Sequence, residues 1–152
     1  MAQLIMVFGR RGMGKTTLLR RWCLDWPGPV FTYDPHGQLA GLPAAPLTGN
    51  ILRAYGPALA AVDEIDRLAP PYRIDPVLAT IANEGRHYGI TLVGTARRPR
   101  RVHRDLTALA DVLYCARITE PTDLRYLADL VGPTAVKPLP TLPPYRFLEL
   151  RL

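Results

Sequence analysis

The sequence predicts a single α/β domain built on a central, mostly parallel β-sheet flanked by helices. Three observations predict this fold: short apolar runs alternate with helix-like segments, the runs are nearly free of polar residues, and most of them end in polar or glycine-rich turns. Uninterrupted apolar runs are typical of parallel strands buried on both faces, and strands that alternate with helices favour a parallel sheet. With 152 residues, 48% of them hydrophobic, the chain is close to the usual size of one domain, so residues 1–152 are expected to form one unit.

Each expected element follows from a local pattern. Apolar runs predict strands at residues 3–8, 30–34, 58–62, 90–95 and 112–116, and an alternating tail predicts another at 145–150. Intervening patterns predict helices at residues 15–24, 51–55, 76–88, 106–109 and 122–130. Pro76 opens one of these helices, and Gly132-Pro133 ends another. The glycine- and proline-rich stretch 37–47 and the proline-rich connector 138–144 are expected to be loops.

The charge of the chain favours an anionic partner. The formal net charge is +6, which suits a nucleotide, a nucleic acid or an acidic membrane surface. Five arginines fall within residues 97–104, so much of this basicity is local. The two cysteines, Cys23 and Cys115, lack a metal-ligand spacing, and neither a disulfide nor a zinc site is expected. Gly9 interrupts the first apolar run well before the roughly 18 apolar residues that a membrane span needs, so no signal peptide or membrane segment is expected.

A phosphate-binding loop is the clearest motif. Residues 9–16 match G-x-x-x-x-G-K-[ST], and they lie between a predicted strand and a predicted helix, as the motif requires. A chance match on a glycine-rich turn is the alternative, and this context argues against it. Lys15 is expected to neutralise the β and γ phosphates, and Thr16 to ligate Mg²⁺. The full set expected to bind the nucleotide is Gly9, Arg10, Arg11, Gly12, Met13, Gly14, Lys15, Thr16 and Thr17.

Two acidic residues follow the third predicted strand. Asp63 at the strand end is expected to hold the shell of the magnesium ion, and Glu64 to polarise an attacking water molecule. A strand that simply ends in solvated acids is the alternative. The position of the pair, about 50 residues after the phosphate loop, argues against that alternative and favours hydrolysis over binding alone.

A family resemblance rests on the fourth predicted strand. Thr95 ends this strand, where it would face the ligand side of a parallel sheet and is expected to sense the γ-phosphate. Residues 85–99 resemble the segment of the HerA/FtsK superfamily that leads into its sensor strand, and the resemblance extends over about residues 3–131. Many relatives have glutamine where Arg97 stands, so a glutamine-type sensor role does not transfer to this chain.

This resemblance implies a P-loop ATPase of the RecA-like, additional-strand type that uses ATP and Mg²⁺. The superfamily consists of ring-forming DNA-pumping motors, among them the genome-packaging ATPases of membrane-containing viruses and phages, whose minimal size this chain matches. The resemblance therefore implies a homo-oligomeric ring, a pentamer or a hexamer, that moves double-stranded DNA. It further implies a viral portal or membrane-vertex protein as partner, in the host cytoplasm or at the vertex of a virion.

The arginines of residues 97–104 have three interpretations. They would contact DNA phosphates, supply an arginine finger to the neighbouring subunit's γ-phosphate, or form a solvated loop. Arg98 and Arg97 are the main candidates for a catalytic arginine, and Arg86, on the helix before the sensor strand, is a weaker one. Tyr72 and Arg73, in the loop after the acid pair, would suit the central pore of a ring.

Other functions remain open. A small-molecule kinase has a similar length and an arginine-rich lid, although the acid pair argues against it because a kinase must keep water from the phosphate. A phage assembly ATPase resembling the Zot proteins would move protein instead of DNA, but such proteins usually carry a membrane segment. A GTPase is least favoured, because the sequence has no Asn-Lys-x-Asp motif. The histidines, His36, His87 and His103, are interpreted as ordinary polar residues. Asp34 would either approach the nucleotide from the second predicted strand or form a turn that ends this strand.

Overall fold

The computed structural model describes residues 2–54 and 56–152, and in this part of the chain seven strands form one sheet. The strands are β1 (Leu4–Phe8), β2 (Val30–Tyr33), β3 (Ala45–Pro46), β4 (Ala58–Val62), β5 (Ile90–Ala96), β6 (Val112–Cys115) and β7 (Leu148–Arg151). Their order across the sheet is β3-β2-β4-β5-β1-β6-β7. Every neighbouring pair is parallel except β6 and β7, which are antiparallel.

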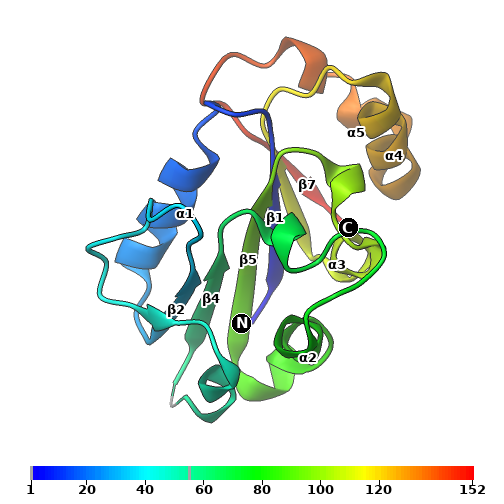
Figure 1. Ribbon diagram of the computed structural model, residues 1–152. Coiled ribbons are helices and arrows are strands. Elements are labelled where there is room, and N and C mark those ends of the chain that lie inside the picture. The colour runs from blue at the N-terminus through cyan, green and yellow to red at the C-terminus, as the bar shows by residue number, and fades with distance from the viewer. Residues whose placement is uncertain (1, 55) are drawn as a thin grey trace.

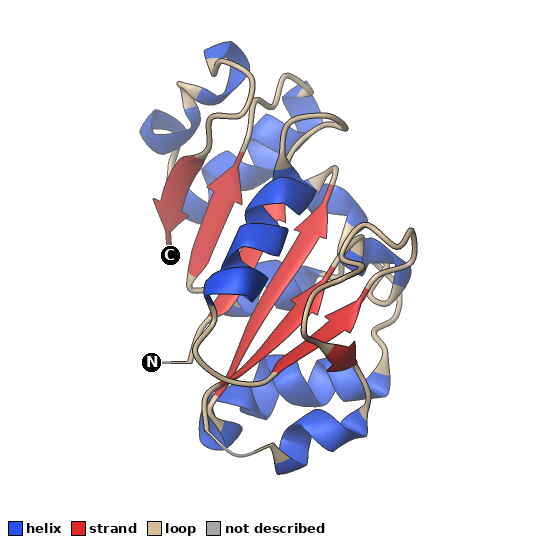
Figure 2. Ribbon diagram, turned by 90° about the vertical axis from the view of Figure 1, so that its left-hand side faces the viewer, coloured by secondary structure: helices blue, strands red, loops and turns tan. Residues whose placement is uncertain are grey.

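Helices cover both faces of this sheet. They are α1 (Lys15–Asp25), α2 (Pro76–Glu84), α3 (Arg104–Leu109), α4 (Pro121–Val131) and α5 (Pro133–Val136), and the 3-10 turns are η1 (Gly49–Arg53), η2 (Ile65–Arg67), η3 (Gly85–Tyr88), η4 (Pro99–Arg101) and η5 (Leu139–Thr141). Helix α1 lies on one face, and α2 to α5 lie on the other (Figure 1). Seen from the side of α1, the helix crosses in front of the strands (Figure 2).

The sequence of the strands explains the two hydrophobic layers. Successive side chains of a strand point to opposite faces, so Met6 and Phe8 pack in the cluster under α2, α3 and α4, whereas Val7 packs in the cluster under α1. Leu19 and Cys23, one helical turn apart on α1, complete that second cluster. All five residues of β4 are fully buried, as a central parallel strand requires.

The strand order confirms the predicted fold. Strand β5, which lies between β1 and β4, is the additional strand of the RecA-like type. Val7 of β1 is in register with Thr95 of β5, and Val62 of β4 is in register with Gly94. Because the carboxyl ends of parallel strands meet at one edge, the phosphate-binding loop, the acid pair and Thr95 lie side by side.

Several expected boundaries were wrong. The helix predicted at 76–88 ends at Glu84 and continues as the 3-10 turn η3, because the chain must reverse at Gly89, with φ of +70°, to enter β5 directly. The stretch 37–47 contains the two-residue strand β3, and the connector 138–144 contains η5. The short helix expected at 51–55 is the 3-10 turn η1, and residue 55 lies outside the described residues.

Other expectations were confirmed. The predicted turn at Asp34 forms, because its carboxylate accepts hydrogen bonds from the amides of Gln38 and Leu39, both at 2.9 Å. Helix α4 ends before Gly132, which has φ of +96°, as predicted. None of the helices in the described part of the chain is long and apolar enough to cross a membrane.

Candidate nucleotide-binding site

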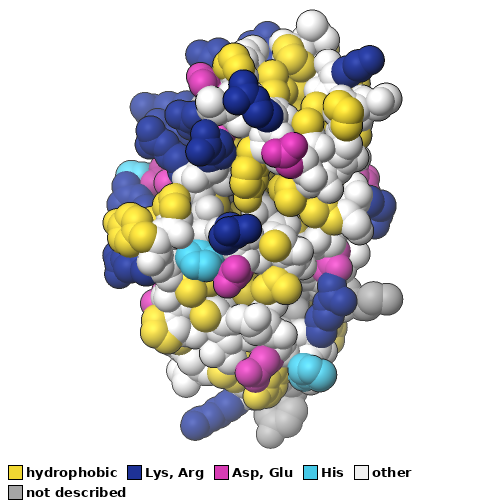
Figure 3. All heavy atoms as spheres, turned by 90° about the vertical axis from the view of Figure 1, so that its right-hand side faces the viewer, with side chains coloured by type: hydrophobic (Ala, Val, Ile, Leu, Met, Phe, Trp, Pro, Cys, Tyr) yellow, Lys and Arg dark blue, Asp and Glu magenta, His cyan; other side chains and the backbone are white. Residues whose placement is uncertain are grey.

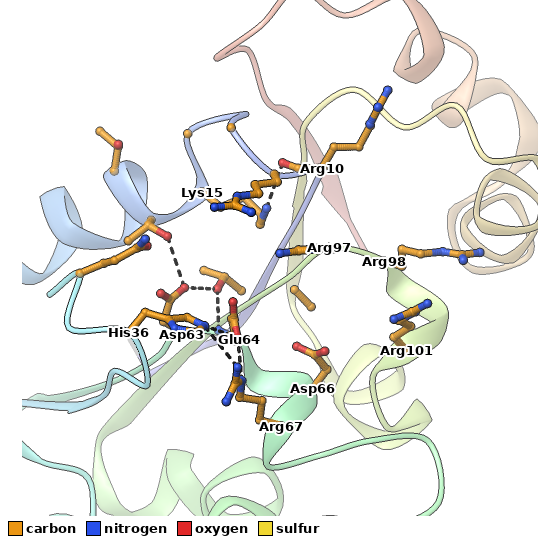
Figure 4. A pocket seen from close by; sticks show the side chains of 18 of the residues that line it. Arg10, Lys15, His36, Asp63, Glu64, Asp66, Arg67, Arg97, Arg98 and Arg101 are labelled. Carbon is orange, nitrogen blue, oxygen red and sulfur yellow. Dashed lines mark hydrogen bonds and ion pairs between the residues drawn. The ribbon is translucent and has the colours of Figure 1, made fainter.

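A large cleft lies at the carboxyl end of the parallel strands. Its volume is about 1130 Å³, and its walls come from the loop before α1, the ends of β4 and β5, the arginines after β5, and the segment before β7. In Figure 4, Lys15 lies on one side of this cleft, and Asp63, Glu64 and Asp66 lie opposite. Cations, hydroxyl groups and carboxylates thus share one space, an arrangement suited to binding a polyphosphate and cleaving it.

The loop before α1 is shaped by two glycines. Gly14 has φ of +93°, in the left-handed region that favours glycine, and α1 begins at the next residue. A Cβ atom at Gly9 would lie 2.6 Å from Cβ of Ala116, so the chain there has no room for a side chain. No side chain in the described part caps the start of α1. Its first amide groups therefore remain available to an anion in the cleft, and the helix dipole favours one.

Lys15 lies against the same loop. Its ammonium group donates hydrogen bonds to the carbonyl oxygens of Gly9 at 2.6 Å and Arg10 at 3.0 Å. Burial lowers the pKa of Lys15, and the positive charge of Arg97 lowers it further, whereas the acid pair opposes both effects. A bound phosphate group would offset the effects of burial and of Arg97 on the pKa of Lys15, because an adjacent negative charge favours the charged form of a lysine.

Asp63, directly after β4, is held by two threonine hydroxyl groups. Thr95 Oγ1 donates a hydrogen bond to Asp63 Oδ1 at 2.6 Å, and Thr16 Oγ1 donates to the same oxygen at 3.4 Å. The Asp63 residue is only 3% exposed, so these bonds satisfy a carboxylate that water hardly reaches. Thr95 Oγ1 also accepts a hydrogen bond from the backbone amide of Glu64 at 3.0 Å. One hydroxyl group therefore ties both acidic residues to the end of β5.

Glu64 has a left-handed backbone, with φ of +51°, which is uncommon for a residue other than glycine. Its Oε2 accepts a hydrogen bond from Arg67 Nε at 2.7 Å and lies 3.1 Å from Nε2 of His36. Partial burial alone would raise the pKa of Glu64, but the hydrogen bonds and charges of Arg67 and His36 outweigh it and lower that pKa. Glu64 therefore stays ionised and is directed by two neighbours.

Thr16 and Asp63 form the candidate metal site. Hydroxyl and carboxylate oxygen atoms are donors that Mg²⁺ prefers, and Oγ1 of Thr16 lies 3.4 Å from Oδ1 of Asp63. Among residues 2–54 and 56–152, no group of three or more His, Cys, Asp or Glu side chains is placed to hold a metal ion. Mg²⁺ is usually bound through one or two protein ligands together with substrate phosphates, and this pair fits that pattern.

The structure separates the two predicted arginines of the cluster. Both line the cleft, but Arg97 points toward Lys15, whereas the side chain of Arg98 extends away from Lys15 (Figure 4). Arg98 Nε donates a hydrogen bond to Oδ2 of Asp123 at 2.8 Å, and Nη2 donates to Oγ1 of Thr122 at 3.3 Å. The bond to Asp123, with its charge, raises the pKa of Arg98. Arg98 is thus anchored within its own chain, whereas no residue of the described part forms a hydrogen bond or ion pair with the Arg97 side chain.

Arg86 lies away from this cleft. It forms an ion pair with Asp111, the residue that precedes β6, so it lies at the end of the sheet where the parallel strands begin. The phosphate-binding loop lies at the other end. Arg86 therefore does not line the cleft of its own chain, and a contact with the cleft of a neighbouring subunit stays a prediction.

Residues that the sequence did not single out also line the cleft, among them His36, Asp66, Arg67 and Tyr145, and Arg101 of the arginine cluster lines it as well. Burial raises the pKa of Asp66, and the charge of Glu64 adds to that rise. The spacing of Arg67, three residues after Glu64, is a signal that could have indicated their contact. His36 follows β2, and only the strand order, which puts β2 next to β4, brings it to the acid pair.

Comparison with known proteins supports the fold. No protein-family profile matches the chain, and no curated protein does. The genome packaging NTPase B204 from Sulfolobus turreted icosahedral virus 2, in complex with ATPγS, matches with a TM-score of 0.83 and 16% sequence identity, over 99% of this chain and 92% of that one.

Two further structures show a weaker likeness. The N-terminal domain of zonular occludens toxin from Neisseria meningitidis matches with a TM-score of 0.54 and 19% identity, over 80% of this chain and 79% of that one. The pCW3 conjugation coupling protein TcpA, in its monomer form with ATPγS, matches with a TM-score of 0.62 and 14% identity, over 99% of this chain and 60% of that one. The resemblance to viral packaging ATPases is therefore confirmed in the fold, and this chain has the P-loop NTPase fold of the packaging enzyme B204.

Proposed function

We propose that this chain hydrolyses ATP to move double-stranded DNA, as one subunit of a homo-oligomeric ring that packages a viral or phage genome. One observation carries the proposal: the phosphate-binding loop, the Thr16 and Asp63 pair and the ionised Glu64 line one cleft. The structural likeness to the packaging NTPase B204 along 99% of the chain supports the choice of this motor over other P-loop enzymes.

Each group of residues in the cleft has its own role in the proposed hydrolysis. The amides at the start of α1 and the ammonium group of Lys15 hold the β and γ phosphates. Glu64 orients the attacking water and accepts its proton, and Arg97 stabilises charge on the γ-phosphate. Thr16 and Asp63 hold Mg²⁺, which supplies charge neutralisation on the phosphate oxygens when bound.

The geometry favours hydrolysis over phosphoryl transfer to a small molecule. Glu64, whose side chain is 30% exposed, lines an open cleft, so a water molecule can reach the position that the acceptor of a kinase would occupy. The likeness to the zonular occludens toxin domain is weaker and covers 80% of the chain, so a Zot-like assembly ATPase is the second candidate. Genome packaging is favoured because the likeness to B204 is closer and nearly complete.

Basic surface near the cleft supports contact with DNA. On the face that carries α2 to α4, Lys and Arg side chains gather in one patch at the upper left of Figure 3. Of the arginines at 97–104, Arg97, Arg100, Arg101 and Arg104 are exposed. Each phosphate that such a side chain neutralises contributes about −0.9 to the slope of log affinity against log salt. A portal or membrane-vertex protein, in the host cytoplasm or at a virion vertex, is a further partner in this proposal.

The decisive experiment measures ATP hydrolysis over a range of protein concentrations, with and without duplex DNA. We expect activity to rise steeply with concentration, because the proposed motor works as an assembled ring, and to increase with DNA. Lys15→Ala should abolish the binding of ATP, and Glu64→Gln should bind ATP without hydrolysing it. Arg125→Ala, which removes an exposed arginine of α4, is the matched charge control. Absence of hydrolysis at every concentration would refute the proposal.

A further inference from the structure

Tyr145 reaches the phosphate-binding loop because of the direction of the last strand. Strand β7 runs antiparallel to β6, and its first residue, Leu148, pairs with Cys115 at the carboxyl end of β6. The residues just before an antiparallel edge strand therefore lie beside the carboxyl ends of the parallel strands. Tyr145 is one of them, and it lines the cleft.

The Tyr145 ring packs directly on the loop backbone. A Cβ atom at Gly14 would lie 2.9 Å from Cδ1 of Tyr145 and 3.6 Å from Cε1, so the ring occupies the space that a side chain at Gly14 would need. Despite this contact, Tyr145 is 69% exposed. A ring fixed at one edge and open elsewhere offers an apolar surface to the cleft.

Tyr145 also has a strained backbone. Its φ is +62°, and Glu64 is the other residue besides glycine with a positive φ in the described part of the chain. Both line the same cleft. Such strain persists only where the surrounding structure enforces it, and it is concentrated at ligand sites.

The neighbours of Tyr145 enforce this conformation. Two prolines precede it, and the amide of Arg146 donates a hydrogen bond to the carbonyl oxygen of Pro143 at 3.3 Å. Phe147 packs into the hydrophobic cluster under α1. The segment is therefore held on both sides of the tyrosine, while the tyrosine itself packs little surface into a core.

The order of the strands sets the direction of a bound nucleotide. The acid pair follows β4, the phosphate loop follows β1, and Tyr145 precedes β7, on the opposite side of β1 from β4. A triphosphate with its γ end at Glu64 thus extends its nucleoside end toward the side of β6 and β7. We propose that the ring of Tyr145 stacks on the base of the bound nucleotide, an inference that rests on the proposed binding of ATP.

The test compares a ligand that has a base with one that lacks it. Full-length wild type, Tyr145→Ala and Tyr145→Phe are titrated with ATPγS and with inorganic tripolyphosphate by calorimetry. Loss of one base stack by alanine substitution weakens nucleic-acid binding about five- to 150-fold, and we expect a loss in this range for ATPγS. Tripolyphosphate affinity should change less than about twofold, and Tyr145→Phe should resemble wild type. Tyr88→Ala is the matched control, because Tyr88 is 44% exposed in η3 and does not line the cleft.

Two results would overturn the inference: unchanged affinity of Tyr145→Ala for ATPγS, or an equal loss for both ligands, which would mean that the ring only supports the loop. Tyr145→Trp gives an independent readout, because its added fluorescence over wild type should respond to ATPγS and not to tripolyphosphate. Failure of the wild type to bind ATPγS would refute nucleotide binding itself. Binding and stacking without hydrolysis would refute only the proposed motor activity.

Discussion

The hydroxyl group of Thr95 donates a 2.6 Å hydrogen bond to Oδ1 of Asp63 and accepts one from the amide of Glu64 at 3.0 Å. Thr95 ends β5, whereas the two acids follow β4, so this hydroxyl group links neighbouring strands at the point where the chemistry is proposed. A ligand that moves Thr95 would move both acids with it. This contact gives the sensor role proposed for Thr95 a physical basis.

Thr95→Val tests that link, because valine keeps the shape of threonine and loses its hydrogen bonds. We expect unfolding in urea to show a stability loss of about 1–3 kcal/mol, the usual cost of unpaired buried polar groups. ATP hydrolysis should fall at least about tenfold, since Glu64 loses its anchor. Thr95→Ser keeps the hydroxyl group and should restore both properties. Wild-type hydrolysis by Thr95→Val would show that the link is dispensable.

Arg98→Ala is expected to destabilise the fold. Asp123 is 2% exposed, and its Oδ1 has no hydrogen-bond partner in the described part of the chain, so Arg98 is the only cation that compensates its charge there. Breaking a fully buried pair costs about 3–5 kcal/mol, and we expect about 2–3 kcal/mol because the Arg98 side chain is 38% exposed. Chemical denaturation measures the loss.

The matched variants separate structure from catalysis in this region. Arg98→Ala combined with Asp123→Asn should recover part of the stability, because the buried charge is gone. Arg97→Ala should change stability by less than about 0.5 kcal/mol, as exposed substitutions usually do. Equal stability of Arg98→Ala and wild type would contradict the prediction and leave Arg98 free to serve a neighbouring subunit.

Gly94→Ala should disturb the segment that carries the acid pair. A Cβ atom at Gly94 would lie 2.4 Å from Cδ1 of Ile65, the residue after Glu64. Overpacking of this kind typically costs about 1–3 kcal/mol. Ile65→Val removes Cδ1. The double variant Gly94→Ala with Ile65→Val should therefore regain part of the stability, measured by thermal unfolding, and part of the rate of ATP hydrolysis. Additive effects of the two substitutions would argue against the contact.

The sequence predicted most elements of the fold and the phosphate loop because these depend on local patterns, but it missed the short elements β3 and α5. The strand at 58–62 and the phosphate loop can be recognised from the apolar run and from the glycines before Lys15, without reference to distant residues. The tail at 145–150 was expected to form a strand, but its alternation does not say which strand it joins or in which direction. Tyr145 therefore gained a place in the cleft only with the sheet topology.

The clustered arginines also show what a local sequence pattern cannot predict. Arg97 and Arg98 are adjacent in a cluster, so their sequence context gave both the same prediction. Successive residues leave the end of β5 in different directions, and the buried Asp123 of α4 engages Arg98 alone. His36 was interpreted as an ordinary polar residue because its partner, Glu64, lies 28 positions away and meets it through the pairing of β2 with β4.

The pH dependence of catalysis should reveal the charge of Arg97 beside Lys15. Burial and Arg97 both lower the pKa of Lys15, so its positive charge is lost at a lower pH than that of a free lysine. The profile of kcat/KM reports the free enzyme, and its alkaline limb should follow this loss of charge. Arg97→Ala removes one of the two causes that lower the pKa of Lys15. The alkaline limb should therefore move to higher pH, even though the maximal rate falls.

The shift is measured from kcat/KM between about pH 7 and pH 10.5, up to the usual range of a lysine pKa. Arg125→Ala, which removes an equal charge from the exposed surface of α4, should leave the limb in place. Added salt should reduce the difference between wild type and Arg97→Ala, because the interaction is electrostatic and the cleft is open to solvent. A limb that stays fixed or moves to lower pH in Arg97→Ala would show that Arg97 does not act on Lys15.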